Sequence, residues 1–273
     1  MKPNAFICSL FGALALLTGC EVPFDTELQT LPPGLVVEGL LVDSVAPQYV
    51  RLSRSQAFTD NSAPPVVTGA AVTVEDLTDA TTYPYTEAEP GLYRSAPFTG
   101  IVGHVYRLTV VQNGETFTAV DTLKRVMALD SVTYEFVEEG QFVDEAAYYL
   151  TTYSTELEGL GDFIEYRFFR NGAPNDYTLE NIRAFQDLRV DGNAIVADWQ
   201  GVFPYAVGDT YAVEIRSLSS NGYNYFTDLT NSGNAGSPFG GPPYTPRTNL
   251  SGPSTVYGFF VCSAVSRLEG VIE

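Results

Sequence analysis

The chain has 273 residues and a formal net charge of −19, because 33 acidic side chains outnumber 14 basic ones. This imbalance argues against nucleic-acid binding, which needs clustered Lys and Arg to neutralise phosphates. A hydrophobic content of 45% is enough to bury a core, whereas one His and three Cys leave no room for a His-rich metal site or a disulfide framework. Composition therefore favours a folded binding or structural protein over most kinds of enzyme.

The first twenty residues have the pattern of a lipoprotein export signal. Lys2 supplies a positive charge, and the apolar run at 5–17 is shorter than the roughly 20 residues that a spanning helix needs. The run ends in Leu17-Thr18-Gly19-Cys20, which resembles the bacterial lipobox. The sequence thus predicts a signal peptide at 1–19 and a lipidated Cys20. The alternative is a conventional secretory peptide that ends beside a chance cysteine.

Residues 20–33 are polar and contain prolines, which predicts a tether between the lipid and a folded body. Glu21, Asp25 and Glu27 place acidic side chains close behind Cys20. In Bacteroidota, acidic residues at this place resemble a signal for export to the outer face of the outer membrane. We therefore expect a lipid-anchored protein of the outer membrane, with exposure on the cell surface as a further hypothesis.

Residues 34–126 are expected to form an immunoglobulin-like β-sandwich. Short runs rich in Val, Leu, Tyr and Thr are separated by turn residues, with no helical segment among them. Asn113-Gly114 is typical of a type I′ hairpin turn, because both residues tolerate a positive φ. The expected strands lie at 35–42, 48–53, 71–75, 91–95, 104–112 and 116–123.

Residues 127–273 are expected to form a second β-sandwich-like domain with one short helix, which makes the whole fold all-β. The helix is predicted within 218–229, where apolar residues lie three and four apart and Ser219 or Ser220 can cap the start. Five Gly and five Pro at 232–253 predict a long loop. The expected strands lie at 131–136, 148–154, 163–170, 194–197, 211–218 and 256–265.

Candidate catalytic residues are few, and each has a simpler interpretation. His104 is the only His and has no accompanying nucleophile motif, so we expect a turn or strand-edge role. The pairs Glu75-Asp76, Glu138-Glu139 and Asp144-Glu145 would serve glycoside hydrolysis only if two carboxyls lay about 5–9 Å apart in a cleft. Glu138-Glu139 and Asp144-Glu145 flank a predicted hairpin loop, so solvated charge is their expected role. No calcium-loop motif is present, so we predict no dedicated metal site, no cofactor and no catalytic residue.

Aromatic side chains are the most suggestive feature of the second half. Most of them are expected in the core, but Phe239 and Tyr244 lie in the Gly/Pro-rich loop. Tyr and Phe provide a large contact area at small entropic cost, so these two residues are candidates for ligand or partner contact. Packing of the loop on its own body is the alternative.

Several short motifs in a fixed order resemble the DUF4249 family of Bacteroidota outer-membrane lipoproteins. They occur along nearly the whole chain after Cys20, and no single one is specific. They are LVVEG (35–39), VRLSRS (50–55), GAAVTVED (69–76), Gly91-Leu92-Tyr93, GHVYRL (103–108), LDSV (129–132), YNYF (223–226) and YGFF (257–260). The resemblance implies an accessory lipoprotein that accompanies a TonB-dependent transporter, and it supplies no catalytic residues.

The expected function is therefore non-enzymatic. The first hypothesis is an outer-membrane lipoprotein that helps a TonB-dependent transporter to capture a nutrient, with the membrane and the transporter as its partners and no nucleic acid. The alternative is a structural or adhesive envelope lipoprotein without a small-molecule ligand. An extracellular hydrolase is a third hypothesis that lacks a motif.

Overall fold

The computed structural model describes residues 33–57, 60, 62–140, 143–175, 178–188, 190–233 and 245–273. The chain divides into two contact units, Met1–Leu31 and Pro32–Glu273, and all described residues belong to the second unit. The signal peptide expected at 1–19 and Cys20, the expected site of lipidation, therefore lie outside the described residues. Where the chain is described, no helix has both the length and the apolarity that crossing a membrane requires.

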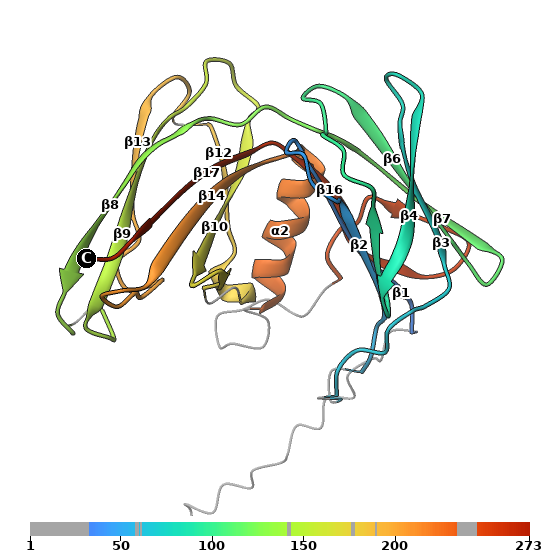
Figure 1. The fold of residues 1–273 in the computed structure, drawn as a ribbon, viewed down its shortest axis with the longest axis horizontal. Helices are drawn as coiled ribbons and strands as arrows, with labels where there is room; N and C mark the ends of the chain where they lie inside the picture. Colours follow the sequence, from blue (N-terminus) through green and yellow to red (C-terminus); the bar gives the residue numbers. More distant parts are fainter. Residues whose placement is uncertain are drawn as a thin grey trace, which may run out of the picture. The chain divides into compact units, whose positions relative to one another are not determined.

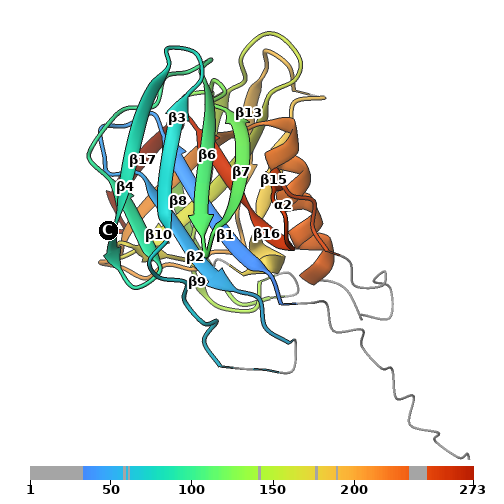
Figure 2. The same ribbon diagram turned by 90° about the vertical axis from the view of Figure 1, so that its right-hand side faces the viewer.

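The predicted all-β fold is confirmed, and its largest part is a nine-stranded sheet. The strands have the spatial order β15-β7-β6-β3-β4-β5-β2-β1-β16. Figure 2 looks onto β4, β3, β6, β7 and β15, which lie side by side in that order. Their bounds are β1 (Leu35–Val42), β2 (Tyr49–Arg54), β3 (Ala71–Asp76), β4 (Thr81–Glu89), β5 (Leu92–Ser95), β6 (Val105–Gln112), β7 (Glu115–Thr122), β15 (Leu250–Ser251) and β16 (Val256–Ser263).

The nine-stranded sheet folds over on itself at β4. The first half of β4 pairs with β3 as far as Tyr85, and from Tyr85 onward the strand pairs with β5. Strand β4 was missing from the predicted set because Pro84 argues against a ladder strand and only Tyr85 of its nine residues is buried. Folding over at this strand lets Val37, Val74 and other buried side chains form one apolar core.

Two smaller sheets form the second half of the described chain. A second apolar core lies between them and includes Leu150, Phe168 and Val213. One sheet contains β10 (Phe163–Arg170), β11 (Ala173–Pro174), β12 (Arg183–Gln186), β14 (Thr210–Leu218) and β17 (Val265–Val271). The other contains β8 (Leu129–Val137), β9 (Ala147–Thr155) and β13 (Ala194–Asp198).

The predicted helix is present as α2 (Ser220–Gly233), and the short 3-10 helix η2 (Leu179–Asn181) contacts it. The Ser219 hydroxyl accepts a hydrogen bond from the Gly222 N–H at 3.1 Å, as expected of a cap. Helix α2 continues to Gly233, past the expected end at 229 and into the segment predicted as a loop. The described end of that segment also contains β15, which pairs with β7.

Helix α2 lies between the strands of the nine-stranded sheet and those of the smaller sheets (Figure 1). The ring of Tyr223 lies 5.0 Å from that of Phe163 on β10. Phe226 belongs to a third buried cluster together with Phe259 and Val261 of β16. The helix therefore fills the space between the two halves with apolar side chains.

The last strand, expected at 256–265, is two strands that belong to different sheets. Strand β16 pairs in parallel with β1, whereas β17 pairs antiparallel with β14. Only Ala264 separates them, and the dark-red ribbon of Figure 1 runs from one sheet into the other. The nine-stranded sheet therefore draws strands from both sides of the boundary expected between 126 and 127.

Gly258 provides a test of the β1–β16 pairing. Its φ is +93°, and a Cβ atom there would collide with the carbonyl oxygen of Val37. We predict that Gly258→Ala lowers the free energy of unfolding by about 2 kcal/mol or more, measured by urea denaturation. Gly103 is the matched control, because its φ is +90° and no atom lies near its virtual Cβ. Equal losses in the two variants would contradict this account of the pairing.

Asp121 on β7 provides a test through pH. It accepts a hydrogen bond from the Cys262 N–H at 2.9 Å, and burial raises the pKa of Asp121 to about 6. Because the unfolded pKa is about 3.9, the folded protein binds an extra proton between these values, so the free energy of unfolding falls as pH rises from about 4 to 6.

We predict that Asp121→Asn removes the pH dependence that Asp121 gives to the free energy of unfolding. Relative to wild type, the variant should gain up to roughly 3 kcal/mol of stability between pH 4 and pH 7, as measured by urea denaturation. Asp144→Asn, at an exposed carboxylate, should follow the wild-type curve. A constant difference between Asp121→Asn and wild type across this range would show that Asp121 does not titrate in this way.

Candidate functional site

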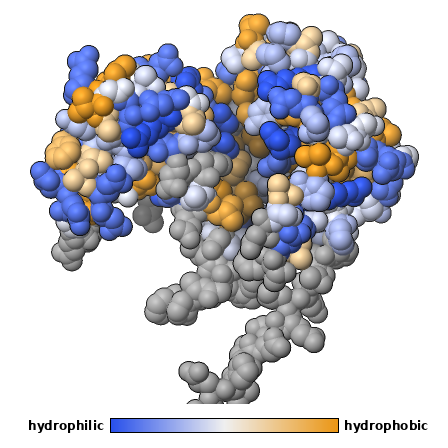
Figure 3. Space-filling view, turned by 60° about the horizontal axis from the view of Figure 1, so that its bottom comes forward, coloured by the Kyte–Doolittle hydropathy of each residue, from blue (hydrophilic) through white to orange (hydrophobic). Residues whose placement is uncertain are grey.

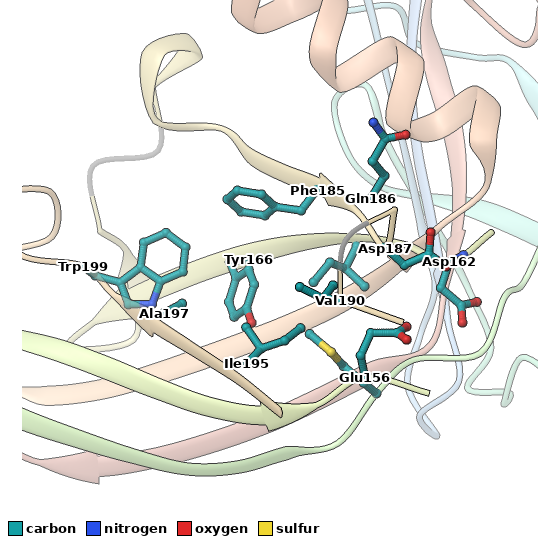
Figure 4. Close-up of a pocket in the computed structure, with 12 residues that line it drawn as sticks. Glu156, Asp162, Tyr166, Phe185, Gln186, Asp187, Val190, Ile195, Ala197 and Trp199 are labelled. Atoms are coloured by element: carbon teal, nitrogen blue, oxygen red, sulfur yellow. Dashed lines mark hydrogen bonds between the residues drawn. The ribbon is translucent and has the colours of Figure 1, made fainter. Parts of the chain in front are cut away.

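A cavity of about 180 Å³ lies between the two smaller sheets. Figure 4 shows its walls, which combine aromatic and aliphatic side chains with a group of carboxylates. The lining residues are Met127, Glu156, Asp162, Ile164, Tyr166, Phe185, Gln186, Asp187, Val190, Ile195, Ala197 and Trp199.

The strand period explains why these side chains share the cavity. Ile164 and Tyr166 are two apart on β10 and therefore project from the same face. Phe185 of β12 lies directly across from Ile164 in the antiparallel ladder and joins that face. Ile195 and Ala197 are likewise two apart on β13 and line the opposite wall.

Three aromatic rings build one side of the cavity. The ring of Tyr166 lies 5.0 Å from that of Trp199, and the ring of Phe185 lies 6.0 Å from that of Tyr166. Trp199 is 5% exposed, and its indole N–H donates to the Thr152 hydroxyl at 3.0 Å. Phe185 is 44% exposed, so it forms the edge of this aromatic wall next to solvent.

Three carboxylates gather at the end of the cavity away from Trp199 (Figure 4). Glu156 follows β9, Asp162 precedes β10 and Asp187 follows β12. Glu156 is 7% exposed and Asp187 is 5% exposed, so both are nearly buried. One oxygen from each of the three lies within 4.8 Å of the others. We call this group the carboxylate end of the cavity.

Backbone N–H groups hold the carboxylate end in place. One oxygen of Asp187 accepts from the amides of Gly161 and Asp162 at 2.6 and 2.9 Å. Glu156 accepts from the Gly192 amide at 3.1 Å. Gly161 has a φ of +110°, and this left-handed conformation, which favours glycine, turns its amide toward Asp187. Glu156 and Asp187 are therefore held by main-chain donors.

Arg125 neutralises one of the three acids. Its guanidinium donates to Asp162 at 2.6 Å and to the carbonyl oxygens of Glu158 and Gly159 at 2.8 and 3.0 Å. The hydrogen bond from Arg125 to Asp162 raises the pKa of the arginine. Arg125 thus stabilises the loop before β10. It is not itself one of the residues that line the cavity.

The chemistry of the cavity is suited to binding. Its described lining supplies apolar surface, aromatic faces and hydrogen-bond acceptors, and it contains no Ser, Cys, Lys or His. The carboxylate end also offers oxygen ligands of the kind that hard cations such as Ca²⁺ prefer. Burial raises the pKa of the Tyr166 phenol, which therefore stays protonated at neutral pH and offers a hydroxyl group.

A comparison with family models covers the whole of this site. The model for a domain of unknown function, DUF4249, matches residues 21–269. The chain belongs to the DUF4249 family. Every residue that lines the cavity falls within the matched segment. None of the curated proteins matches the chain.

The structure places the carboxylate pairs singled out from the sequence of this DUF4249 protein away from the cavity. The pairs at Glu138-Glu139 and Asp144-Glu145 are exposed, as solvated charge would be. Glu75 forms an ion pair with Arg107 at 3.3 Å. None of these residues is part of the cavity lining.

His104, the only histidine, contacts a buried acid at a distance of 2.7 Å. This acid is Asp76, and together with the exposed Asp79 the pair forms a second cluster with metal-ligand spacing. Burial is the largest influence on the pKa of Asp76 and raises it, but the hydrogen bonds from His104 and from the Thr78 amide bring it below its ordinary value. His104 directly precedes β6, so its predicted place at a turn is confirmed.

The two loop aromatics proposed for ligand contact in this DUF4249 protein, Phe239 and Tyr244, lie outside the described residues, as does Cys20. Their roles stay predictions. The cavity instead uses residues that the sequence analysis did not single out, above all Glu156, Asp187 and Trp199. In the sequence, the only indication of this cavity was the single Trp close to a stretch rich in Gly and Asp. Such a stretch is also typical of ordinary turns, so it did not identify a site.

Proposed function

We propose that this DUF4249 protein is a lipid-anchored outer-membrane protein that captures a small ligand for a TonB-dependent transporter. The observation that carries the proposal is the cavity between the smaller sheets, which joins an aromatic wall to fixed carboxylates. Concave sites that are mostly apolar and contain a few placed polar groups are typical of small-molecule binding. A purely structural spacer has no need of such a site.

The sequence supports the membrane part of the proposal. The lipobox-like ending at Cys20 would attach acyl chains, and several such chains together give stable anchoring. The described residues supply the body that the anchor would hold, and Figure 3 shows hydrophilic and apolar residues interspersed on one face of it. A net charge of −19 favours solubility of such a body beside a crowded membrane.

Removal of the acylated thiol tests the proposal in the native host. We predict that wild-type protein purified in mild detergent carries labelled palmitate and brings a TonB-dependent transporter with it. Cys20→Ala should lose the label, move to the soluble fraction and recover no transporter, because the acyl chains hold the protein at the membrane. The measurements are label incorporation, fractionation and mass spectrometry of the recovered proteins.

Cys8→Ala is the control, since this cysteine lies in the expected signal peptide and should leave the label and the transporter unchanged. Repeated purifications of labelled wild-type protein without any transporter would contradict the partnership. A deletion strain with altered adhesion and normal nutrient uptake would favour the structural alternative.

A further inference from the structure

Among the described residues, three carboxylates meet at the carboxylate end of the cavity and a single cationic side chain, Arg125, forms an ion pair there. Arg125 forms its direct ion pair with Asp162, and it also interacts electrostatically with Glu156. Within the described part of the chain, neither Glu156 nor Asp187 has a Lys, Arg or His partner within 4.0 Å, although both are nearly buried. Buried charges are costly unless they are paired, so a site that retains two such carboxylates is prepared for a cation.

We propose that the cavity binds a small organic cation, with its ring against Trp199 and Tyr166 and its ammonium group on Glu156 and Asp187. This inference rests on the ligand-capture function proposed above and names the class of ligand. Both parts of the ligand meet a matching wall, since the aromatic faces lie at one end of the cavity and the carboxylates at the other (Figure 4).

The size of the cavity agrees with one ring and a short amine. An apolar cavity of about 150 Å³ is large enough to hold benzene, and this one has about 180 Å³. The carboxylate oxygens are already oriented by the amides of Gly161, Asp162 and Gly192, so little reorganisation accompanies binding. An ammonium group supplies three donors to these acceptors.

The geometry favours an organic cation over a metal ion. Calcium takes six to eight oxygen ligands, whereas Asp162 is tied to Arg125 and one oxygen of Asp187 already accepts two amides. A bare ion would also leave the aromatic part of the cavity unfilled. Cationic groups are attracted to the faces of Trp and Tyr, so the aromatic wall adds to the same preference.

The test uses 2-phenylethylammonium as the probe and 2-phenylethanol as its uncharged counterpart. Because Trp199 is the only tryptophan of the chain and lies in the cavity wall, its fluorescence reports occupancy directly. In titrations of the detergent-purified lipoprotein, we expect the amine to bind at least about tenfold more tightly than the alcohol. Glu156→Gln should remove most of this preference, and Glu138→Gln, at an exposed acid, should retain it.

A second pair of variants keeps the test decisive if Glu156→Gln does not fold. Ala197→Leu should fill the cavity and abolish binding of both compounds, whereas Val196→Leu, on the exposed face of the same strand, should leave binding unchanged. Equal affinity for amine and alcohol, with both lost in Ala197→Leu, would contradict the proposal that the ligand is a cation. It would still support the proposed capture of a small ligand in this cavity. Binding of calcium chloride that Glu156→Gln abolishes, without a response to the amine, would overturn the proposal in favour of a metal site. Failure of both compounds to bind would contradict both proposals.

Discussion

The structure depends on burial of β16 between two apolar cores. Phe260 and Cys262 point into the core of the nine-stranded sheet, whereas Phe259 and Val261 point into the cluster with α2. A strand buried on both faces must be apolar along its length, because each side chain loses its contact with water. Its hydrogen bonds to β1 hold this strand in the nine-stranded sheet, and its packing against the cluster with α2 links that sheet to the second half.

The chain changes sheets directly after β16, and a small polar junction makes the change possible. The Ser217 hydroxyl donates to the Lys124 carbonyl at 2.7 Å and accepts from the Ala264 amide at 2.8 Å. The Ser263 hydroxyl donates to the Ser217 carbonyl at 2.6 Å. Buried backbone groups are thereby satisfied where regular pairing stops. The junction fixes β14 and β17, and β14 in turn positions β10 with the aromatic wall of the cavity.

Sequence patterns predicted those strands and helix ends that are determined by residues close together in the chain. Twelve of the described strands correspond to short runs of alternating or continuous apolar residues. The cap at Ser219 was predictable because it acts within one helical turn. Strand β4 was not predicted because Pro84 and its mostly exposed side chains are untypical of a strand within a sheet. The change of sheet at Ala264 was not predicted because it depends on which distant strand lies alongside. The cavity was missed because its carboxylates come from two loops that are distant in sequence: Glu156 and Asp162 lie between β9 and β10, and Asp187 follows β12.

The proposed preference for an organic cation rests on two nearly buried carboxylates without a direct ion pair among the described residues, and on the aromatic wall beside them. A crystal structure of the protein grown with 2-phenylethylammonium would show where the amine binds. We expect the ammonium nitrogen within about 3 Å of Glu156 and Asp187, with the ring packed on Trp199. A metal ion held by the three carboxylates, or the amine bound elsewhere with the cavity unfilled, would contradict this expectation.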